Sequence, residues 1–300
     1  MPAARNQHGL ARTIPEHVKR AVRQRDGFGC IICGKAIFDY EHFDPEFSDA
    51  CEHDAGGIVL LCIEHHGLKT RGLLSRETIA SHLRNPHCRK AGFSFGAFDI
   101  GSMHPEIVMG GMTCTDTRCL INLYGDEIFS IAPPVEESMP FRISAELRGL
   151  DGETILKIVE NEWRSESSNW DVDIQGAVIT IRNALRKIDL VLRSDPPKRI
   201  IIERLQMTHK GCRIQCSEEE GLIITDPNGT SFGANRTSFN GFDTAVAFTE
   251  NGLSVGLPPP VHSAWPGAQI PSTPQKPSRN SRCDCGSGLR FKHCHGKLSS

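Results

Sequence analysis

The stretch that most constrains this chain runs from residue 30 to residue 70 and reads CIICGKAIFDYEHFDPEFSDACEHDAGGIVLLCIEHHGLKT. It contains two pairs of metal-binding residue types at one spacing, Cys30-x-x-Cys33 and Cys62-x-x-His65. Three thiols and one imidazole in two such pairs suit a closed, tetrahedral zinc site with a structural role. We therefore expect these four side chains to surround one zinc ion.

His42 and His66 of the same stretch are not used by that zinc site. If residues 64–70 form a helix, His66 points about 100° away from His65 and is free to bind a second ion. Upstream, Glu41 and His42 place a carboxylate beside an imidazole. Neighbours on a strand point to opposite faces, so one of them can bind the ion while the other acts on a water molecule.

These residues resemble the HNH endonucleases, whose core is two short strands and a helix around one metal. The resemblance covers residues 12–86 and rests on RDGFGCIICG, YEH and LLCIEHHGLKT in that order. It implies that His42 is the general base, that Glu41 is a ligand of the catalytic ion, and that His66 is the ligand on the helix. It also implies that the substrate is double-stranded DNA.

The chain departs from the HNH pattern at two positions. Thr70 occupies the position of the family's final histidine, and Gly57 occupies the position of its middle asparagine. The work of that asparagine, which is to orient the base or the metal site, must pass to another residue. Asp54 and His53 are the nearest candidates.

Around this stretch, Thr13 is a plausible cap for a basic helix that ends at Asp26-Gly27. Short strands are expected over 37–42 and 58–61, and Ser75 can cap a helix that runs to about residue 84. The basic helix carries four cations that could contact phosphate or could form the wet side of an amphipathic helix, and both interpretations stay open: Lys19, Arg20, Arg23 and Arg25.

Residues 93–255 show a different pattern, in which short alternating apolar runs are separated by turn residues. FRISAEL and TILKIV flank Asp151-Gly152 and predict a hairpin, and Asp226-Pro227-Asn228-Gly229 predicts another turn. Strands at this spacing without long helices indicate a sandwich, a barrel or a stacked β array. We expect the remaining cysteine pairs of this region to be buried free thiols.

The C-terminal residues divide into a linker and a second cysteine-rich segment. Residues 256–280 are rich in Pro, Ser and Gly and predict a semi-extended linker. The following RCDCGSGLRFKHCHGK resembles the SEC-C motif over residues 280–297. That resemblance implies a second zinc site and contacts to a protein partner, with these ligands: Cys283, Cys285, Cys294 and His295.

Charge and cysteine use bear on the compartment and on the partners. Both ends of the chain are basic and its centre is acidic, so phosphate contacts are expected from the ends. We see no apolar leader and no apolar run long enough to span a bilayer. Six of the twelve cysteines fall in the two ligand-like clusters, which favours a reducing cytoplasm over a secreted disulfide scaffold.

Together these patterns predict an α+β multidomain protein. Its parts are an HNH nuclease domain with a ββα-metal module (12–90), an all-β domain (93–255), a linker (256–280) and a SEC-C zinc motif (281–298). The expected function is metal-dependent hydrolysis of DNA phosphodiester bonds. The expected cofactors are two structural Zn²⁺ ions and a catalytic divalent ion, Mg²⁺ or Mn²⁺, with Ni²⁺ or Zn²⁺ as alternatives. The competing hypothesis is a non-catalytic zinc-binding adaptor that binds nucleic acid or protein.

Overall fold

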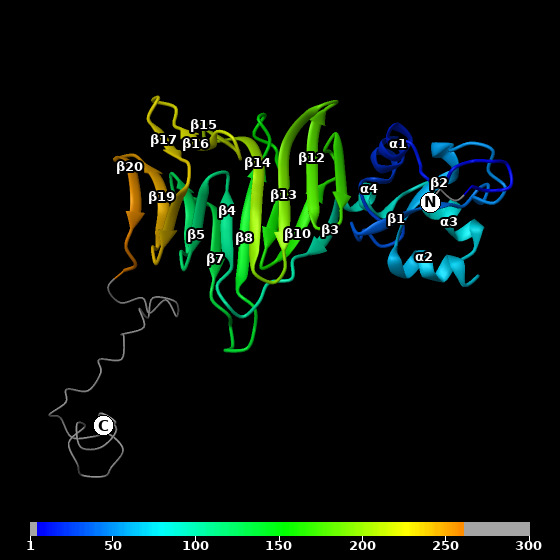
Figure 1. Cartoon of the computed structure of the whole chain (residues 1–300), viewed down its shortest axis with the longest axis horizontal. Coiled ribbons are helices and arrows are strands. Elements are labelled where there is room, and N and C mark those ends of the chain that lie inside the picture. Colours follow the sequence, from blue (N-terminus) through cyan, green and yellow to red (C-terminus); the bar gives the residue numbers. More distant parts are fainter. Residues whose placement is uncertain (1–4, 261–300) are drawn as a thin grey trace, which may run out of the picture. The chain divides into compact units, whose positions relative to one another are not determined.

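The computed structural model describes residues 5–260, and the helices lie near the start of this range (Figure 1). The helices are α1 (Glu16–Asp26), α2 (Ile63–Thr70), α3 (Arg76–Leu83), α4 (His87–Ala91) and the 3-10 helix η1 (Ala55–Gly57). Ser75 caps α3 as expected, because its hydroxyl accepts a hydrogen bond from Thr78 N at 3.1 Å. Thr13 is not the cap of α1, because that position belongs to Pro15.

The strands occupy most of the remaining chain. They are β1 (Phe38–His42), β2 (Ile58–Cys62), β3 (Phe93–Ala97), β4 (Glu106–Met109), β5 (Met112–Thr115), β6 (Cys119–Leu123), β7 (Asp126–Ala132), β8 (Arg142–Arg148), β9 (Thr154–Val159), β10 (Glu162–Glu166), β11 (Asp171–Gln175), β12 (Val178–Ala184), β13 (Lys187–Asp195), β14 (Arg199–His209), β15 (Cys212–Ser217), β16 (Gly221–Thr225), β17 (Ser231–Ala234), β18 (Thr237–Asn240), β19 (Thr244–Thr249) and β20 (Gly252–Leu257). The predicted hairpin at Asp151-Gly152 joins β8 to β9, and the turn at residues 226–229 joins β16 to β17.

Two large sheets form an all-β domain. One has eight strands in the order β20-β19-β6-β7-β8-β9-β10-β3. The other has ten, with β11 to β17 in sequence order and with β4, β5 and β18 attached through β14. Inward positions alternate along β8 and β14, which lie against each other, so Leu147 and Leu205 are both fully buried between the sheets. The cysteines of this domain that the sequence places in pairs are buried free thiols.

The N-terminal segment is built around β2, whose five residues are all buried. β1 and β2 pair antiparallel, with His42 opposite Ile58. Val22 of α1 packs with Ile58 and Leu60 on one face of β2. On the other face, Val59, Leu61 and Cys62 of the strand belong to a second buried cluster. The other members of this cluster come from outside the strand: Cys30, Ile31, Phe43 and Ile79. Burial on both faces explains why IVLLC is an unbroken apolar run.

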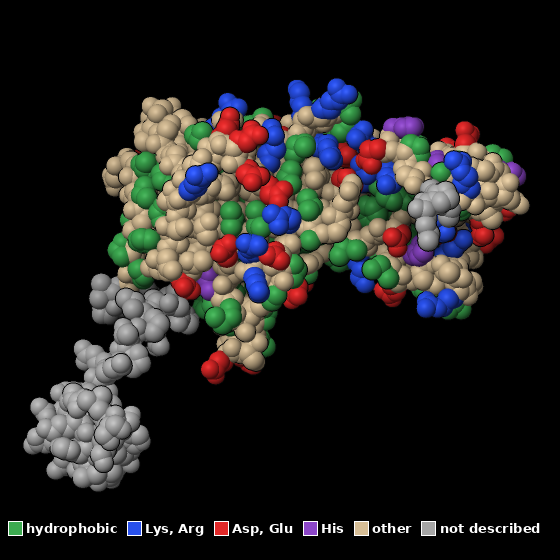
Figure 2. Space-filling view, viewed as in Figure 1, with side chains coloured by type: hydrophobic (Ala, Val, Ile, Leu, Met, Phe, Trp, Pro, Cys, Tyr) green, Lys and Arg blue, Asp and Glu red, His purple; other side chains and the backbone are tan. Residues whose placement is uncertain are grey.

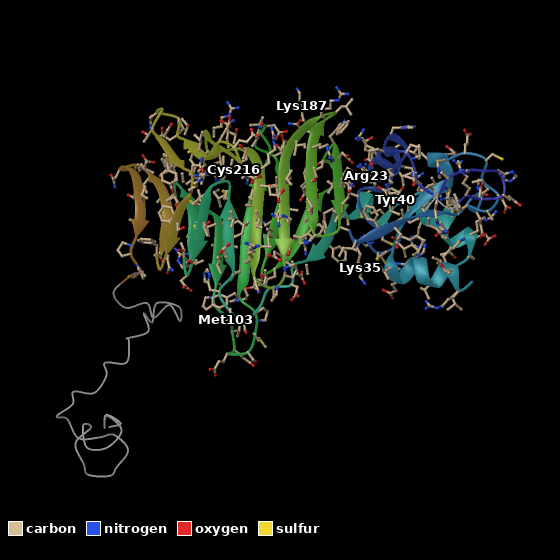
Figure 3. All side chains as sticks on the ribbon, viewed as in Figure 1. Arg23, Lys35, Tyr40, Met103, Lys187 and Cys216 are labelled. Carbon is tan, nitrogen blue, oxygen red and sulfur yellow. The ribbon has the colours of Figure 1, made fainter. Side chains whose placement is uncertain are left out.

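This segment is joined to the β domain at two places. The loop after α1 pairs with β3, since Ala36 N donates to Phe95 O at 2.8 Å and Phe95 N donates to Gly34 O at 3.1 Å. On the other side, Arg23 of α1 is fully buried and binds Asp171 of β11 through two hydrogen bonds of 2.8 and 2.9 Å (Figure 3). The N-terminal elements are therefore packed onto the sheets.

The predicted fold class is wrong. Within residues 5–260, strands account for 47% of the residues and helices for 14%, so the protein is mostly β and not α+β. No ββα-metal nuclease module is evident as a fold unit, because the short N-terminal elements are built onto a large all-β domain. The sequence reasoning gave too much weight to the short helices, since a motif of some forty residues does not set the class of a chain of 300 residues.

The described residues 5–260 lie within one compact unit, and the domain boundaries drawn from the sequence stay predictions. The Pro-rich segment lies almost wholly outside the described residues, and the SEC-C segment lies entirely outside them. Within residues 5–260, no helix is both long enough and apolar enough to cross a bilayer.

Candidate metal centre and adjoining pocket

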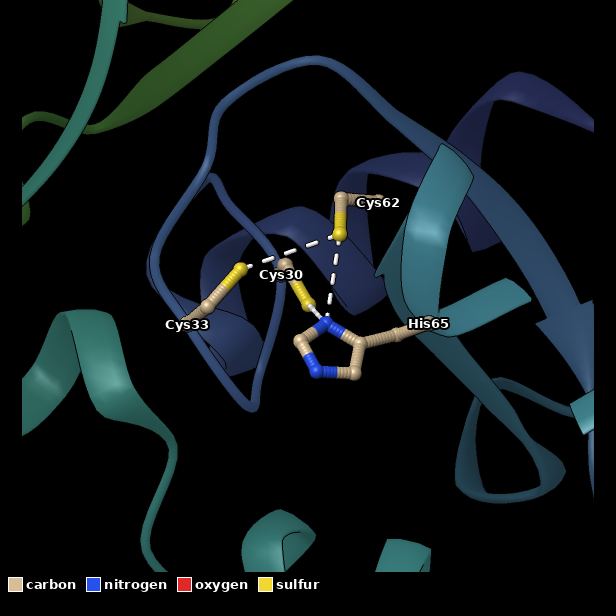
Figure 4. Close-up of side chains that lie close together, drawn as sticks. All are labelled: Cys30, Cys33, Cys62 and His65. Atoms are coloured by element: carbon tan, nitrogen blue, oxygen red, sulfur yellow. Dashed lines mark hydrogen bonds between the residues drawn. The ribbon is translucent and has the colours of Figure 1, made fainter. Parts of the chain in front are cut away.

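The four residues of the predicted zinc site lie together. Cys30 and Cys33 belong to the loop after α1, Cys62 ends β2, and His65 lies in the first turn of α2 (Figure 4). Their ligand atoms all lie within 4.8 Å of one another. His65 Nδ1 is 3.4 Å from Cys30 Sγ and 3.2 Å from Cys62 Sγ, and the sulfurs of Cys33 and Cys62 are 3.7 Å apart.

This arrangement fits zinc. Zn–S bonds of about 2.3 Å in a tetrahedron place neighbouring ligand atoms roughly 3.3–3.8 Å apart, which is close to the 3.2–3.7 Å of the three close pairs. Contact with Cys33 and hydrogen bonds from backbone N–H groups lower the pKa of Cys30, and the same contact with Cys30 raises the pKa of Cys33. A low pKa favours the thiolate, which is the form that binds metal. His65, and not His66, belongs to the cluster.

The loop that carries Cys30 and Cys33 is shaped by its glycines. Gly27 ends α1 in the left-handed conformation, with φ 81°, and Gly34 has φ 84°. Gly34 N donates to Cys30 O at 2.9 Å, and Cys30 N donates to Lys35 O at 2.9 Å. The chain therefore turns tightly around the two thiols, as a Cys-x-x-Cys pair requires if both sulfurs face one point.

An open pocket of about 870 Å³ lies next to the centre, on the side of β1 and α2. The residues that line it are Arg12, Ile14, Asp39, Tyr40, Glu41, His42, Glu46, Phe47, Ser48, His66, Lys69, Thr70 and Gly72. The three residues predicted to be catalytic are among them: Glu41, His42 and His66. The pocket thus gathers three carboxylates, two imidazoles and two cations on one surface.

Glu41 connects the strand to the helix. Its Oε2 lies 2.9 Å from His66 Nε2, and its Oε1 lies 3.0 Å from Lys69 Nζ. His66 and Lys69 are three residues apart on α2 and therefore project from the same side of the helix. Glu41 and His66 present two adjacent donor atoms that one divalent ion could bind, while Lys69 balances the charge of the carboxylate.

His42 lies on β1 beside Glu41 and contacts the loop that follows. Its Nε2 is 3.0 Å from His53 Nδ1, and the Phe47 ring meets it edge to face at 5.5 Å. Burial, together with the neighbouring His53 and Arg12, lowers the pKa of His42 to about 4. The imidazole is therefore neutral near pH 7 and able to accept a proton.

The two candidates for the missing asparagine have different positions. His53 contacts His42, whereas Asp54 caps η1, because its carboxylate accepts from Gly56 N at 3.1 Å. At Gly57, an added Cβ would lie 2.2 Å from Asp44 O, so this position has no room for an asparagine side chain. Of the two, only His53 is in contact with the proposed base.

The three arginines of α1 that the sequence analysis singled out make polar contacts within the fold. Arg23 is buried against Asp171, and Arg20 binds the same carboxylate at 3.3 Å. Arg25 donates to the backbone oxygens of Ala55 and Ile58. These contacts favour the structural interpretation of the basic helix over the phosphate-binding one.

Several pocket residues were not predicted from the sequence, among them Arg12, Phe47 and Lys69. Lys69 could have been found, because it follows His66 by one helical turn. Arg12 had no local signal, since it reaches the pocket only because residues 5–12 lie across the loop of residues 43–55. Asn6 fixes that crossing by donating to Phe47 O and Ala50 O at 2.6 Å each.

Comparison with known families places a SEC-C motif at residues 279–297, where the sequence resemblance had placed it. No match to an HNH family was found. The ligands proposed there, Cys283, Cys285, Cys294 and His295, lie outside the described residues.

Curated relatives match over short stretches. The protein translocase subunit SecA of Caulobacter sp. (strain K31) is 44% identical over 50 residues, which is 17% of this chain and 5% of that protein. SecA of Gluconobacter oxydans (strain 621H) is 29% identical over 119 residues, which is 32% of this chain and 12% of that protein. The chain thus spans a small fraction of the relatives it matches. No solved structure matches it.

Proposed function

We propose that this protein is a metal-dependent, HNH-type endonuclease that hydrolyses phosphodiester bonds of DNA. The observation that carries the proposal is an open pocket lined by Glu41, His42 and His66, the last of which follows the centre residue His65 on α2. Phosphodiester hydrolysis needs an activated water molecule and neutralisation of charge at the phosphate. The pocket contains residue types for both tasks.

Each residue has a separate role in this proposal. His42, which is neutral near pH 7, accepts a proton from the attacking water. Glu41 and His66 hold one divalent ion, Mg²⁺ or Mn²⁺, with Ni²⁺ or Zn²⁺ as alternatives. Such an ion supplies Lewis-acid stabilisation of the phosphate charge when it is bound. The Cys30 centre is structural, since its four ligands close the coordination shell.

The charge at the pocket that best supports a polyanionic substrate is that of Arg12, since Lys69 pairs with Glu41 and Glu46. Arg12 is exposed, stacks on the Phe47 ring at 5.4 Å, and has no carboxylate partner among residues 5–260. Lys69 faces the same space from α2. A guanidinium without an acidic partner beside the proposed base is suited to a phosphate oxygen.

The proposal extends to the C-terminal motif and to the compartment. A second zinc would be held by Cys283, Cys285, Cys294 and His295 and would present the SEC-C segment to a protein partner. Three reduced thiols around one centre also suit a cytoplasmic protein.

A second candidate function is a non-catalytic adaptor that binds nucleic acid or protein. The observation that favours it is the ion pair of Lys69 with Glu41 at 3.0 Å, which balances the carboxylate without a metal ion. In an adaptor the same pocket would bind a phosphate through Arg12 and Lys69 and leave it intact.

A plasmid-nicking assay over Mg²⁺, Mn²⁺, Ni²⁺ and Zn²⁺ tests the two candidates. His42→Ala should lower the rate by about 10²–10⁴, as the loss of a general base does. His66→Ala should raise the ion concentration needed. His17→Ala is the matched control, because His17 is exposed on α1 and lies outside the pocket.

Two results would contradict the enzyme. One is a His42→Ala protein that cuts as fast as the parent. The other is a parent that cuts with none of the four ions; if it then binds DNA in a way that Arg12→Ala weakens, the adaptor is the supported function.

A further inference from the structure

His42 is the first member of a chain of hydrogen-bonding groups that ends on the backbone. His42 Nε2 lies 3.0 Å from His53 Nδ1, and His53 Nε2 lies 2.9 Å from Ala11 O. The two imidazole rings are tilted by 52°, with their centroids 5.2 Å apart. Both ring nitrogens of His53 are therefore engaged, one on each side.

The direction of this chain follows from its last member. A carbonyl oxygen only accepts, so His53 Nε2 must carry the proton that it donates to Ala11. A neutral imidazole has one N–H, so His53 Nδ1 is an acceptor. His42 Nε2 must then be the donor in the second bond, and the basic lone pair of His42 is left on Nδ1.

The residues around His53 hold this geometry in place. The Phe47 ring lies nearly parallel to the His53 ring, with an interplanar angle of 14° at 6.4 Å. The side-chain amide of Asn6 binds the loop before His53 through Phe47 O and Ala50 O. Residues 5–11 therefore supply both the Ala11 carbonyl that orients His53 and the Asn6 side chain that fixes its loop.

We propose that His53 is a positioning residue that holds His42 as its Nε2–H tautomer, so that Nδ1 of His42 is the nitrogen that accepts the proton of the attacking water. The catalytic part of this proposal rests on the proposed function. Its structural part, the tautomer, is independent of it. His53 thereby does the orienting work for which position 57 has no room, because a Cβ there would meet Asp44 O at 2.2 Å.

Two amide substitutions of His53 separate positioning from simple anchoring. In His53→Asn, the amide oxygen takes the place of Nδ1 and can still accept from His42, while the bond to Ala11 is lost. In His53→Gln, the amide nitrogen takes the place of Nε2 and can still donate to Ala11, while the acceptor facing His42 is lost. If His53 only anchors its loop, His53→Gln should keep the His42 tautomer and the nicking rate of the parent. If His53 positions His42, His53→Asn should keep them instead.

The first readout is the tautomer itself. In the full-length protein labelled with ¹⁵N-histidine, long-range proton–nitrogen spectra distinguish a protonated Nε2 from a protonated Nδ1, and the signals of His42 are assigned by their loss in His42→Asn. We expect Nε2–H in the parent and in His53→Asn, and a mixture of tautomers in His53→Gln. Nδ1–H in the parent, or an unchanged His42 spectrum in His53→Gln, would overturn the proposal.

The second readout is the nicking rate on supercoiled plasmid with saturating Mn²⁺. A wrongly held histidine tautomer costs up to about 10⁴ in a serine protease, and we expect His53→Gln to lose on the order of 10² in kcat with KM little changed. His53→Asn should retain most of the parent rate. Equal rates for the parent and His53→Gln would overturn the positioning role, whereas a parent without nicking activity contradicts the proposed function and leaves the spectra as the test of His53.

Discussion

Because Gly57 lies close to the backbone of Asp44, replacing Gly57 with the asparagine of the HNH pattern is expected to destabilise the protein. Ordinary van der Waals contact of a Cβ begins near 3.4 Å, and a Cβ on Gly57 would lie 2.2 Å from Asp44 O and 3.1 Å from Asp44 C. Both atoms belong to the backbone, so no rotamer change relieves the overlap. The end of β1 would have to move by about 1 Å, and overpacking of this kind typically costs about 1–3 kcal/mol.

Gly57→Ala is therefore expected to destabilise the protein by about 3 kcal/mol, at the upper end of that range because backbone must move. For a chain of this size, about 3 kcal/mol corresponds to a Tm lowered by about 6–12 °C. Gly57→Asn should be no more stable, and it should nick DNA less than the parent, because the same shift displaces His42. Thermal unfolding followed by circular dichroism in zinc-containing buffer measures the first effect.

Gly67 provides the matched control. It lies inside α2, where an added Cβ would meet only the mobile end of Arg71 at 3.0 Å. Gly67→Ala should therefore stabilise the protein, since Ala exceeds Gly by about 0.5–1 kcal/mol in a helix interior. If Gly57→Ala unfolds at or above the parent Tm, or if Gly57→Asn nicks faster than the parent, the steric reasoning is refuted.

Three further predictions concern the centre, the junction and the pH response. Cys62→Ser should lower the bound zinc measured by atomic absorption and lower the Tm, because the serine hydroxyl is a poor replacement for a thiolate ligand; an unchanged zinc content would count against the centre. Asp171→Ala should cost about 3–5 kcal/mol in urea unfolding, since it leaves the Arg23 guanidinium buried without its main partner; a loss under about 0.5 kcal/mol, the level of an ordinary surface substitution, would contradict this. Arg118 holds the pKa of Asp243 below its ordinary value of 3.8. The pair therefore stabilises the fold above that pH, the contribution is lost as pH falls through the lower folded-state pKa, and Asp243→Asn should flatten this part of the acid-unfolding curve.

The sequence was informative where residue spacing and side-chain chemistry coincide. The Cys-x-x-Cys and Cys-x-x-His pairs predicted the membership of the centre, because a small ion imposes short distances on whatever binds it. Alternating apolar runs predicted β8 and β9, because a strand buried on one face has a period of two. The turn residues Asp226-Pro227-Asn228-Gly229 predicted the turn between β16 and β17.

Predictions from the sequence were wrong, or absent, where packing between distant segments determines the structure. Strand pairing within the sheets, such as that of β14 with β4, joins distant segments. Nothing in the sequence of one strand indicates which strand is its partner. The burial of Arg23 depends on Asp171, which lies 148 residues away, so a basic helix looked as suitable for phosphate as for packing. Arg12 reaches the pocket only because Asn6 and His53 fix the segment before it. The fold class of the whole chain was predicted wrongly because the prediction relied on a motif of some forty residues more than on the β pattern of the other residues.

The pairing of the metal-binding loop with β3 has a consequence for aggregation. β3 is the last strand of its sheet, and the loop that carries Cys30 and Cys33 hydrogen-bonds to it at Phe95, on the edge that β10 leaves open. An uncovered edge strand is a template for pairing with another chain. Removing the metal would loosen this cover and expose Phe95, so a chelated protein would be prone to edge-to-edge self-association even while its two large sheets stay folded.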